Sequence, residues 1–343
     1  MRPTILALGA RQAGEGWPCL ILASVASAHE GSADTALAMI EAAFKMGADG
    51  IVFQVFRAEH LLVRRHPFRR DLDQVELRPR DWERVLKAAR ASGLSVLVEA
   101  FDRPSLDVAA TAAVDAFLVH TTDMENPEFI RAVGAQGRPV LLAAQGLPEG
   151  AVREALDLVG GAPAGLLHGF PRFPAPVEEI RFRDIASWKE RYRVPVGFLD
   201  QTDGGSAFAL VVPALAAAHG ADLVLKHFTL DRSRKGPDYQ ASLSPEDFYR
   251  MVELLRLAER ARGDGAAEGS AGASQVRRDL ARSIVAGGLI PRGEVLTVNM
   301  LSFKRADTRF GPGFPPREAH RVIGRRATRP IQADETIRED MLE

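Results

Sequence analysis

Lys226 and His227 end an apolar run at residues 221–225 and begin the polar segment KHFTLDR at residues 226–232. A short apolar run bounded by polar residues is typical of a buried strand. In a barrel of parallel strands, the side chains at the carboxyl ends of the strands form the active site. His227 is therefore placed where a barrel enzyme uses an imidazole. A histidine that is hydrogen-bonded for the sake of the fold is an equally good interpretation.

Polar residues also follow other apolar runs of the chain. They are Glu99, His120, Gln145, His168, Asp200 and Gln201. Because the carboxyl ends of barrel strands meet at one mouth, we expect these side chains and His227 to converge there. A carboxylate with two or three imidazoles commonly ligates zinc, iron or manganese, so Glu99 and His120 are candidate metal ligands. The alternative is a mouth that collects polar side chains without binding a metal.

Alternating apolar runs and amphipathic segments extend from Cys19 to about residue 260, which is the pattern of βα units on a parallel sheet. Strands are predicted at residues 19–24, 50–53, 95–98, 116–119, 139–143, 165–167, 194–197 and 221–225. Helices are predicted at residues 34–46, 79–92, 104–112, 126–133, 149–159, 182–192, 207–219 and 244–261. Eight such units in ~240 residues predict an α/β fold, the (β/α)8 TIM barrel.

A small, polar and Gly-rich segment interrupts this pattern and predicts a flexible linker at residues 262–276. The linker divides the chain into a barrel domain at residues 1–261 and a smaller domain at residues 277–343. In the smaller domain, residues 278–282, 290–296 and 322–327 are predicted to form short strands and turns. We therefore expect a small, mostly β module.

The composition excludes several function classes. Lysine and arginine number 44 against 45 aspartate and glutamate residues, so no global field favours nucleic acid or an anionic membrane. The single cysteine, Cys19, fits a reducing compartment, and the apolar run at residues 5–10 is too short for a signal or membrane segment. We expect a cytoplasmic protein without membrane or nucleic-acid partners. No P-loop or Rossmann fingerprint is present, so no nucleotide cofactor is expected.

The segments KHFTLDR (226–232), GPD (236–238) and ASL (241–243) together resemble the N-acetylneuraminate (sialic acid) synthase family. Residues 277–343 resemble the antifreeze-like SAF domain that this family carries at its C-terminus. The resemblance implies carbohydrate biosynthesis by condensation of phosphoenolpyruvate with an N-acyl amino sugar, a small-molecule substrate. It also implies a divalent metal, manganese or magnesium, held by His227 and the residue at the position of Gln201. A domain-swapped homodimer is implied as well.

The same resemblance suggests site residues one by one. The catalytic candidates are His29, Gln54, Asp102, His168 and Asp200. Arg305, beside Lys304, occupies the position of the arginine that the small domain adds to the sugar pocket. Lys226 and Arg181 are further candidates for substrate binding.

The chain departs from the family pattern at the strand ends. Val52 and Leu118 replace two lysines, Leu225 replaces a glutamate, and Gln201 replaces an imidazole. Phosphoenolpyruvate carries a phosphate and a carboxylate, so its pocket needs several cations and donors, which Val52 and Leu118 do not supply. Three hypotheses follow: a divergent synthase, a non-catalytic homologue that binds or regulates, and a rewired barrel enzyme that uses zinc or iron.

Overall fold

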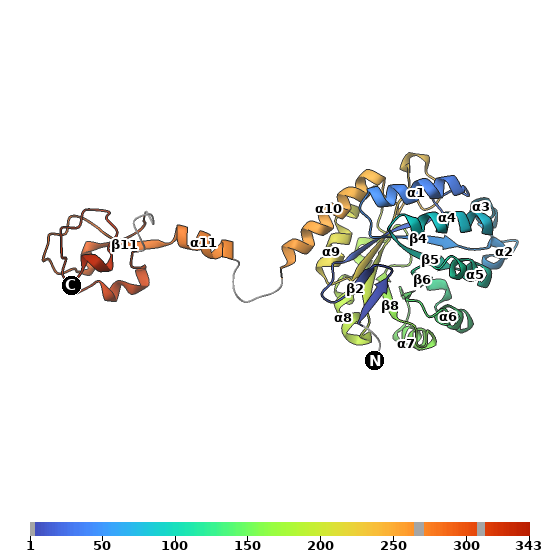
Figure 1. The fold of residues 1–343 in the computed structure, drawn as a ribbon, viewed down its shortest axis with the longest axis horizontal. Coiled ribbons are helices and arrows are strands. Elements are labelled where there is room, and N and C mark those ends of the chain that lie inside the picture. The colour runs from blue at the N-terminus through green and yellow to red at the C-terminus, as the bar shows by residue number, and fades with distance from the viewer. Residues whose placement is uncertain (1–3, 264–270, 307–312) are drawn as a thin grey trace. The chain divides into compact units, whose positions relative to one another are not determined.

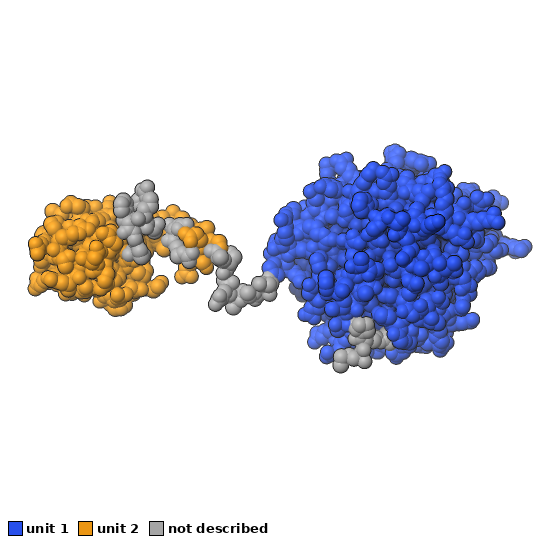
Figure 2. Space-filling model, viewed as in Figure 1, with its two compact units in different colours: residues 1–263 blue, residues 264–343 orange. Residues whose placement is uncertain are grey.

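The computed structural model describes residues 4–263, 271–306 and 313–343, in two compact units, Met1–Gly263 and Asp264–Glu343 (Figures 1 and 2). The division lies inside the segment predicted as a linker. Within the described ranges, no helix is both long and apolar enough to cross a membrane.

The first unit is a closed barrel of eight parallel strands in the order β10-β3-β4-β5-β6-β7-β8-β9 (Figure 1). The strands are β3 (Leu20–Ala26), β4 (Gly50–Val55), β5 (Ser95–Ala100), β6 (Ala116–Val119), β7 (Val140–Ala143), β8 (Ala164–Gly169), β9 (Val196–Asp200) and β10 (Leu223–His227). The eight predicted barrel strands and the predicted barrel are confirmed. Most strands run two or three residues beyond their predicted ends, because barrel strands continue through the polar residues at the mouth.

Helices surround the barrel (Figure 1). They are α1 (Ala33–Lys45), α2 (Ala58–Leu61), α3 (Arg69–Val75), α4 (Pro79–Ala91), α5 (Arg103–Thr111), α6 (Pro127–Gly134), α7 (Glu149–Leu158), α8 (Arg183–Tyr192), α9 (Val212–Ala218) and α10 (Pro245–Arg262). The eight predicted helices are present, although residues 207–219 form a 3₁₀ turn (Ala207–Leu210) followed by α9. Two further short helices, α2 and α3, lie in the loop after β4.

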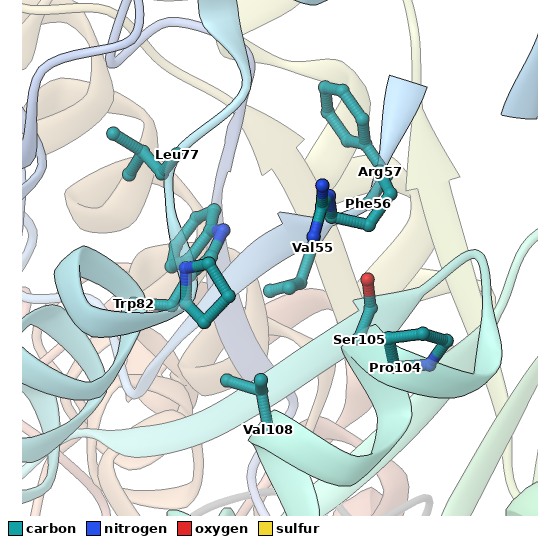
Figure 3. A pocket seen from close by; sticks show the side chains of 9 residues that line it. Val55, Phe56, Arg57, Leu77, Trp82, Pro104, Ser105 and Val108 are labelled. Atoms are coloured by element: carbon teal, nitrogen blue, oxygen red, sulfur yellow. The ribbon is translucent and has the colours of Figure 1, made fainter. Parts of the chain in front are cut away.

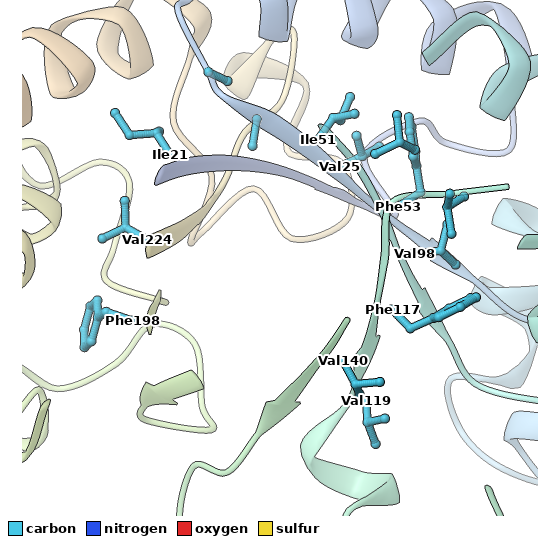
Figure 4. Packing of buried hydrophobic residues seen from close by; sticks show 14 of the residues in the cluster. Ile21, Val25, Ile51, Phe53, Val98, Phe117, Val119, Val140, Phe198 and Val224 are labelled. Atoms are coloured by element: carbon cyan, nitrogen blue, oxygen red, sulfur yellow. The ribbon is translucent and has the colours of Figure 1, made fainter. Parts of the chain in front are cut away.

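Side chains of the strands alternate between two cores. One face packs against the helices, and Figure 4 shows members of this outer core such as Ile51, Phe53 and Phe117. The other face fills the barrel interior. The interior cluster is Leu6, Leu8, Ala13, Leu20, Leu22, Val52, Leu97, Ala116, Leu118, Leu141, Ala143, Leu167, Leu199, Leu223 and Leu225. Successive residues of a strand therefore lie on opposite sides of the barrel wall.

An antiparallel hairpin of β1 (Ile5–Leu8) and β2 (Arg11–Gly14) closes the amino end of the barrel. Leu6 and Leu8 join the interior cluster, and the backbone oxygen of Leu8 accepts a 2.7 Å hydrogen bond from Ser95 Oγ at the start of β5. The hairpin was not predicted. The interior is thus sealed at the end opposite the mouth.

The second unit contains α11 (Ala271–Leu280) and an antiparallel pair of β11 (Arg282–Ala286) and β12 (Leu301–Arg305). Short bridges such as Ile290 to Ile331 and Val295 to Arg326 complete a mostly non-helical module around its own apolar core. Two predictions need correction here. Residues 278–280 belong to α11 rather than to a strand, and α11 also occupies the end of the predicted linker. Residues 264–270 of the predicted linker lie outside the described ranges.

Candidate site at the barrel mouth

The strand alternation decides which polar residues face the mouth. Leu97 and Val52 belong to the interior cluster. Glu99 lies two residues after Leu97 and Gln54 two residues after Val52, so both side chains face inward. By the same count, the interior side of the wall also carries His120, Gln145, Gln201 and His227. Of the seven side chains expected to converge at the mouth, the alternation therefore assigns five to it. Asp200 and His168 fall on the other side of the wall, as does Lys226.

Gln54 and Glu99 form one contact of this mouth. Nε2 of Gln54 donates a 2.7 Å hydrogen bond to Oε2 of Glu99, across neighbouring strands β4 and β5. Glu99 is 4% exposed, and its second oxygen, Oε1, is buried without a partner. Burial raises the pKa of Glu99, whereas His120 and the bond from Gln54 lower it. This carboxyl group has spare hydrogen-bonding capacity.

His227 contributes from β10. It is 8% exposed, and its Nδ1 is buried without a hydrogen-bond partner. Burial lowers the pKa of His227, and the charge of Asp238 opposes this effect. Asp238 also acts on the pKa of Glu99, which places its carboxylate within electrostatic reach of both side chains. Asp238 lies in the GPD segment and was not among the predicted site residues.

His120 and Gln201 are engaged by neighbouring loops. Nδ1 of His120 lies 2.8 Å from Thr122 Oγ1 and accepts from the Thr122 backbone N–H, so His120 caps the turn after β6. In the orientation that satisfies its amide, Gln201 donates to the backbone oxygens of Phe170 at 2.6 Å and Arg172 at 3.3 Å. Both side chains hold loops of the mouth in place.

An apolar layer lies directly beneath these polar residues. Val52 and Leu118 are 1% exposed and Leu225 is 2% exposed, and all three belong to the interior cluster. These are the positions where the family resemblance implies two lysines and a glutamate. Below its mouth the barrel is therefore a packed hydrocarbon core.

Lys226 and Asp200 form an ion pair on the helix-facing side of the wall. Nζ of Lys226 lies 3.0 Å from Oδ2 of Asp200 and donates to the backbone oxygen of Thr202 at 3.0 Å. Oδ1 of Asp200 accepts from the backbone N–H and the hydroxyl of Thr202. Lys226 and Asp200 are fully buried, and burial lowers the pKa of Lys226. This ammonium group does not point into the mouth.

His168 also lies on the helix-facing side. Its ring packs edge-on against Trp188, with ring centroids 4.8 Å apart, and against Phe198. Nε2 lies 3.3 Å from the backbone oxygen of Ile180, and burial lowers the pKa of His168. These contacts join α8 to the barrel wall.

His29 lies in the loop after β3 and packs against α4. Its ring lies edge-on to Trp82, with centroids 5.4 Å apart, and its Nδ1 accepts from the backbone N–H of Gly31. Burial lowers the pKa of His29 to about 4. Trp82 also lines a small, mostly apolar pocket between α4 and α5, shown in Figure 3. This pocket opens between helices and does not include the inward-facing residues of the mouth.

Asp102 caps a helix. Its Oδ1 accepts from the Ser105 N–H at the start of α5, and its Oδ2 accepts from the Arg57 N–H, both at 2.7 Å. Both carboxylate oxygens are therefore occupied by backbone donors.

Two predicted arginines are exposed. Arg181 pairs with Asp184 at 2.7 Å in the turn before α8. Arg305 ends β12 in the second unit.

The side chains predicted as metal ligands do not form a ready site. Among the described residues, no three His, Cys, Asp or Glu side chains are grouped closely enough to hold a metal ion. Glu99 is bonded to Gln54 and His120 to its own turn, so the residues present do not fit a metal in this arrangement. The metal at His227 stays a prediction from resemblance.

Comparisons with known proteins cover nearly the whole chain. The model of the NeuB family matches residues 39–267, and that of the SAF domain matches residues 281–343. An uncharacterized protein of Methanocaldococcus jannaschii is 29% identical, with 96% of each chain covered. The N,N'-diacetyllegionaminic acid synthase of Legionella pneumophila is 26% identical, again with 96% of each covered. The N-acetylneuraminic acid synthetase of Leptospira borgpetersenii, solved with citrate, has the same fold, with a TM-score of 0.74, 23% identity, and coverage of 81% of this chain and 98% of that one.

Proposed function

Because this chain belongs to the NeuB family of sugar acid biosynthesis and carries a SAF domain, we propose that its barrel binds an amino sugar without condensing it with phosphoenolpyruvate. The observation that carries the proposal is the apolar layer beneath the mouth. In this proposal the chain is a non-condensing member of its family, and a binding or regulatory role replaces the synthase reaction.

The apolar layer argues against a phosphoenolpyruvate pocket. Val52, Leu118 and Leu225 offer no charge or donor to a phosphate or a carboxylate. An anion buried against hydrocarbon without a cation loses its hydration and gains nothing in return. Lys226 does not compensate, because its ammonium group is bound to Asp200 behind the wall.

The inward-facing polar residues support retained sugar binding. Gln54, Glu99 and His227 come from three different strands and offer donors and acceptors for hydroxyl and amide groups. Sugar sites are built from such fixed polar groups at the mouths of barrels.

Calorimetry with phosphoenolpyruvate, alone and with Mn²⁺, is the first test. We expect no binding, and no phosphate release when N-acyl amino sugars are added. Micromolar binding of phosphoenolpyruvate, or phosphate release that depends on the sugar, would overturn the proposal and restore the divergent synthase.

Metal content and assembly are tested in parallel. Metal analysis of protein purified without a histidine tag decides whether manganese, magnesium, zinc or iron is bound, and loss of that metal in His227→Ala would assign it to His227. Stoichiometric metal that is lost on Glu99→Ala would favour the rewired metal enzyme instead. Light scattering tests the expected homodimer.

A further inference from the structure

Two buried polar atoms at the mouth lack partners, and they come from well-separated strands. Oε1 of Glu99 belongs to β5 and Nδ1 of His227 to β10, with β3 and β4 between them in the barrel. Both side chains are more than nine-tenths buried and face the interior. A buried polar atom without a partner costs free energy, so a ligand that supplies the missing hydrogen bonds gains affinity.

The charges around these atoms are acidic. The charged groups that act on Glu99 are His120, which lowers its pKa, and the carboxylates of Asp123 and Asp238, which raise it. Asp238 and His120 also act on His227, in opposite directions, together with Lys226 and Asp200, which neutralise one another at 3.0 Å. A mouth with this balance attracts a cation and repels an anion.

We infer that the mouth takes a sugar with a free amino group, whose ammonium group donates to Oε1 of Glu99 while a neighbouring hydroxyl group bonds Nδ1 of His227. This inference rests on the proposed function, the binding of an amino sugar at the mouth, and specifies that the amino group of that sugar is free rather than acylated. An ammonium group supplies both the charge and the donor that Glu99 lacks. An N-acetyl group removes the charge and adds bulk above a packed leucine layer.

The test compares mannosamine with N-acetylmannosamine by calorimetry on the full chain at neutral pH and low salt. We expect mannosamine to bind at least about tenfold more tightly, since a charge-assisted hydrogen bond is roughly twice as strong as a neutral one. Higher ionic strength should weaken mannosamine binding alone, because salt screens the ion pair. This comparison needs no variant, so a failure of a variant to fold does not affect it.

Glu99→Gln keeps the shape of the side chain and removes its charge. It should lower mannosamine affinity at least about tenfold and abolish the preference over the N-acetyl sugar. Glu246→Gln, on the exposed face of α10, is the matched control and should change neither.

The outcomes separate the inference from the proposed function. Equal or tighter binding of N-acetylmannosamine, or an unchanged preference in Glu99→Gln, overturns the inference and leaves the proposed function standing. Micromolar phosphoenolpyruvate binding overturns the proposed function whichever sugar is preferred. Absence of binding by either sugar overturns both.

Discussion

The ammonium group of Lys226 lies 3.0 Å from the carboxylate of Asp200, and both side chains are fully buried between the barrel wall and the helices. Lys226 is adjacent in sequence to His227, yet the two side chains lie on opposite faces of β10. The most family-like segment of the chain thus sends one side chain to the mouth and uses the other to hold β9 against β10. Pairing of this kind stabilises the wall rather than a ligand.

Lys226→Met should lower the free energy of unfolding by about 3–5 kcal/mol, because it leaves Asp200 as an unpaired buried charge. Urea denaturation followed by fluorescence measures this change. Lys45→Met removes an exposed pair with Glu41 and is the control, for which we expect no measurable change. A loss below about 1 kcal/mol for Lys226→Met would contradict a structural role for the pair.

Asp102→Ala should lower the free energy of unfolding by about 1–3 kcal/mol, since it removes the cap of α5 and the acceptor for the Arg57 N–H. Asp102→Asn keeps one acceptor oxygen and should cost less. Sugar binding by the folded fraction should be unchanged in both variants. Lost binding at unchanged stability, seen by calorimetry and urea denaturation together, would give Asp102 the site role that the family resemblance suggested.

The sequence predicted the eight strands because each carries a continuous apolar run that is buried on both faces. It missed the hairpin of β1 and β2, since Arg11–Gly14 contains almost no apolar signal and owes its place to the partner strand. It also missed α3, Arg69–Val75, in which Val75 is the one buried residue, Leu72 is partly buried and the other residues are charged or polar. Helices and strands held by tertiary contacts leave little trace in local pattern.

The sequence predicted which polar residues lie at the strand ends, but not which face of the barrel wall each one occupies. Polar residues at strand ends were expected to converge, but Asp200 and Gln201 are neighbours and must face opposite ways on one strand. Leu199 and Leu225 lie in the barrel interior, so the residues two positions after them, Gln201 and His227, also face inward. The sequence alone does not say which of the two apolar faces of a doubly buried strand is the interior one.

Val52→Lys tests whether the layer beneath the mouth is a packed core. The substitution places an ammonium group among leucines without a partner, so we expect a loss of several kcal/mol in the free energy of unfolding and no gain of phosphoenolpyruvate binding. Val52→Met is the matched control for size and should cost about 1–3 kcal/mol. Full stability of Val52→Lys together with phosphoenolpyruvate binding would show that an anion pocket survives at this position.

The acid sensitivity of the fold should depend on His29. Burial lowers its pKa from 6.5 to about 4 in the folded protein, so between these values the unfolded chain binds a proton that the folded protein does not. The contribution of neutral His29 is complete above pH 6.5 and is lost as the pH falls towards 4, by up to about 3 kcal/mol. In His29→Gln the unfolding free energy should therefore fall less steeply over this window, by a slope that corresponds to about one proton. Urea denaturation at several pH values measures this slope. Carboxylates and the other buried histidines titrate in both proteins, so the difference between wild type and variant isolates His29.

Parallel curves for the two proteins, or an imidazole resonance of His29 that titrates near 6.5, would show that burial does not hold this ring neutral.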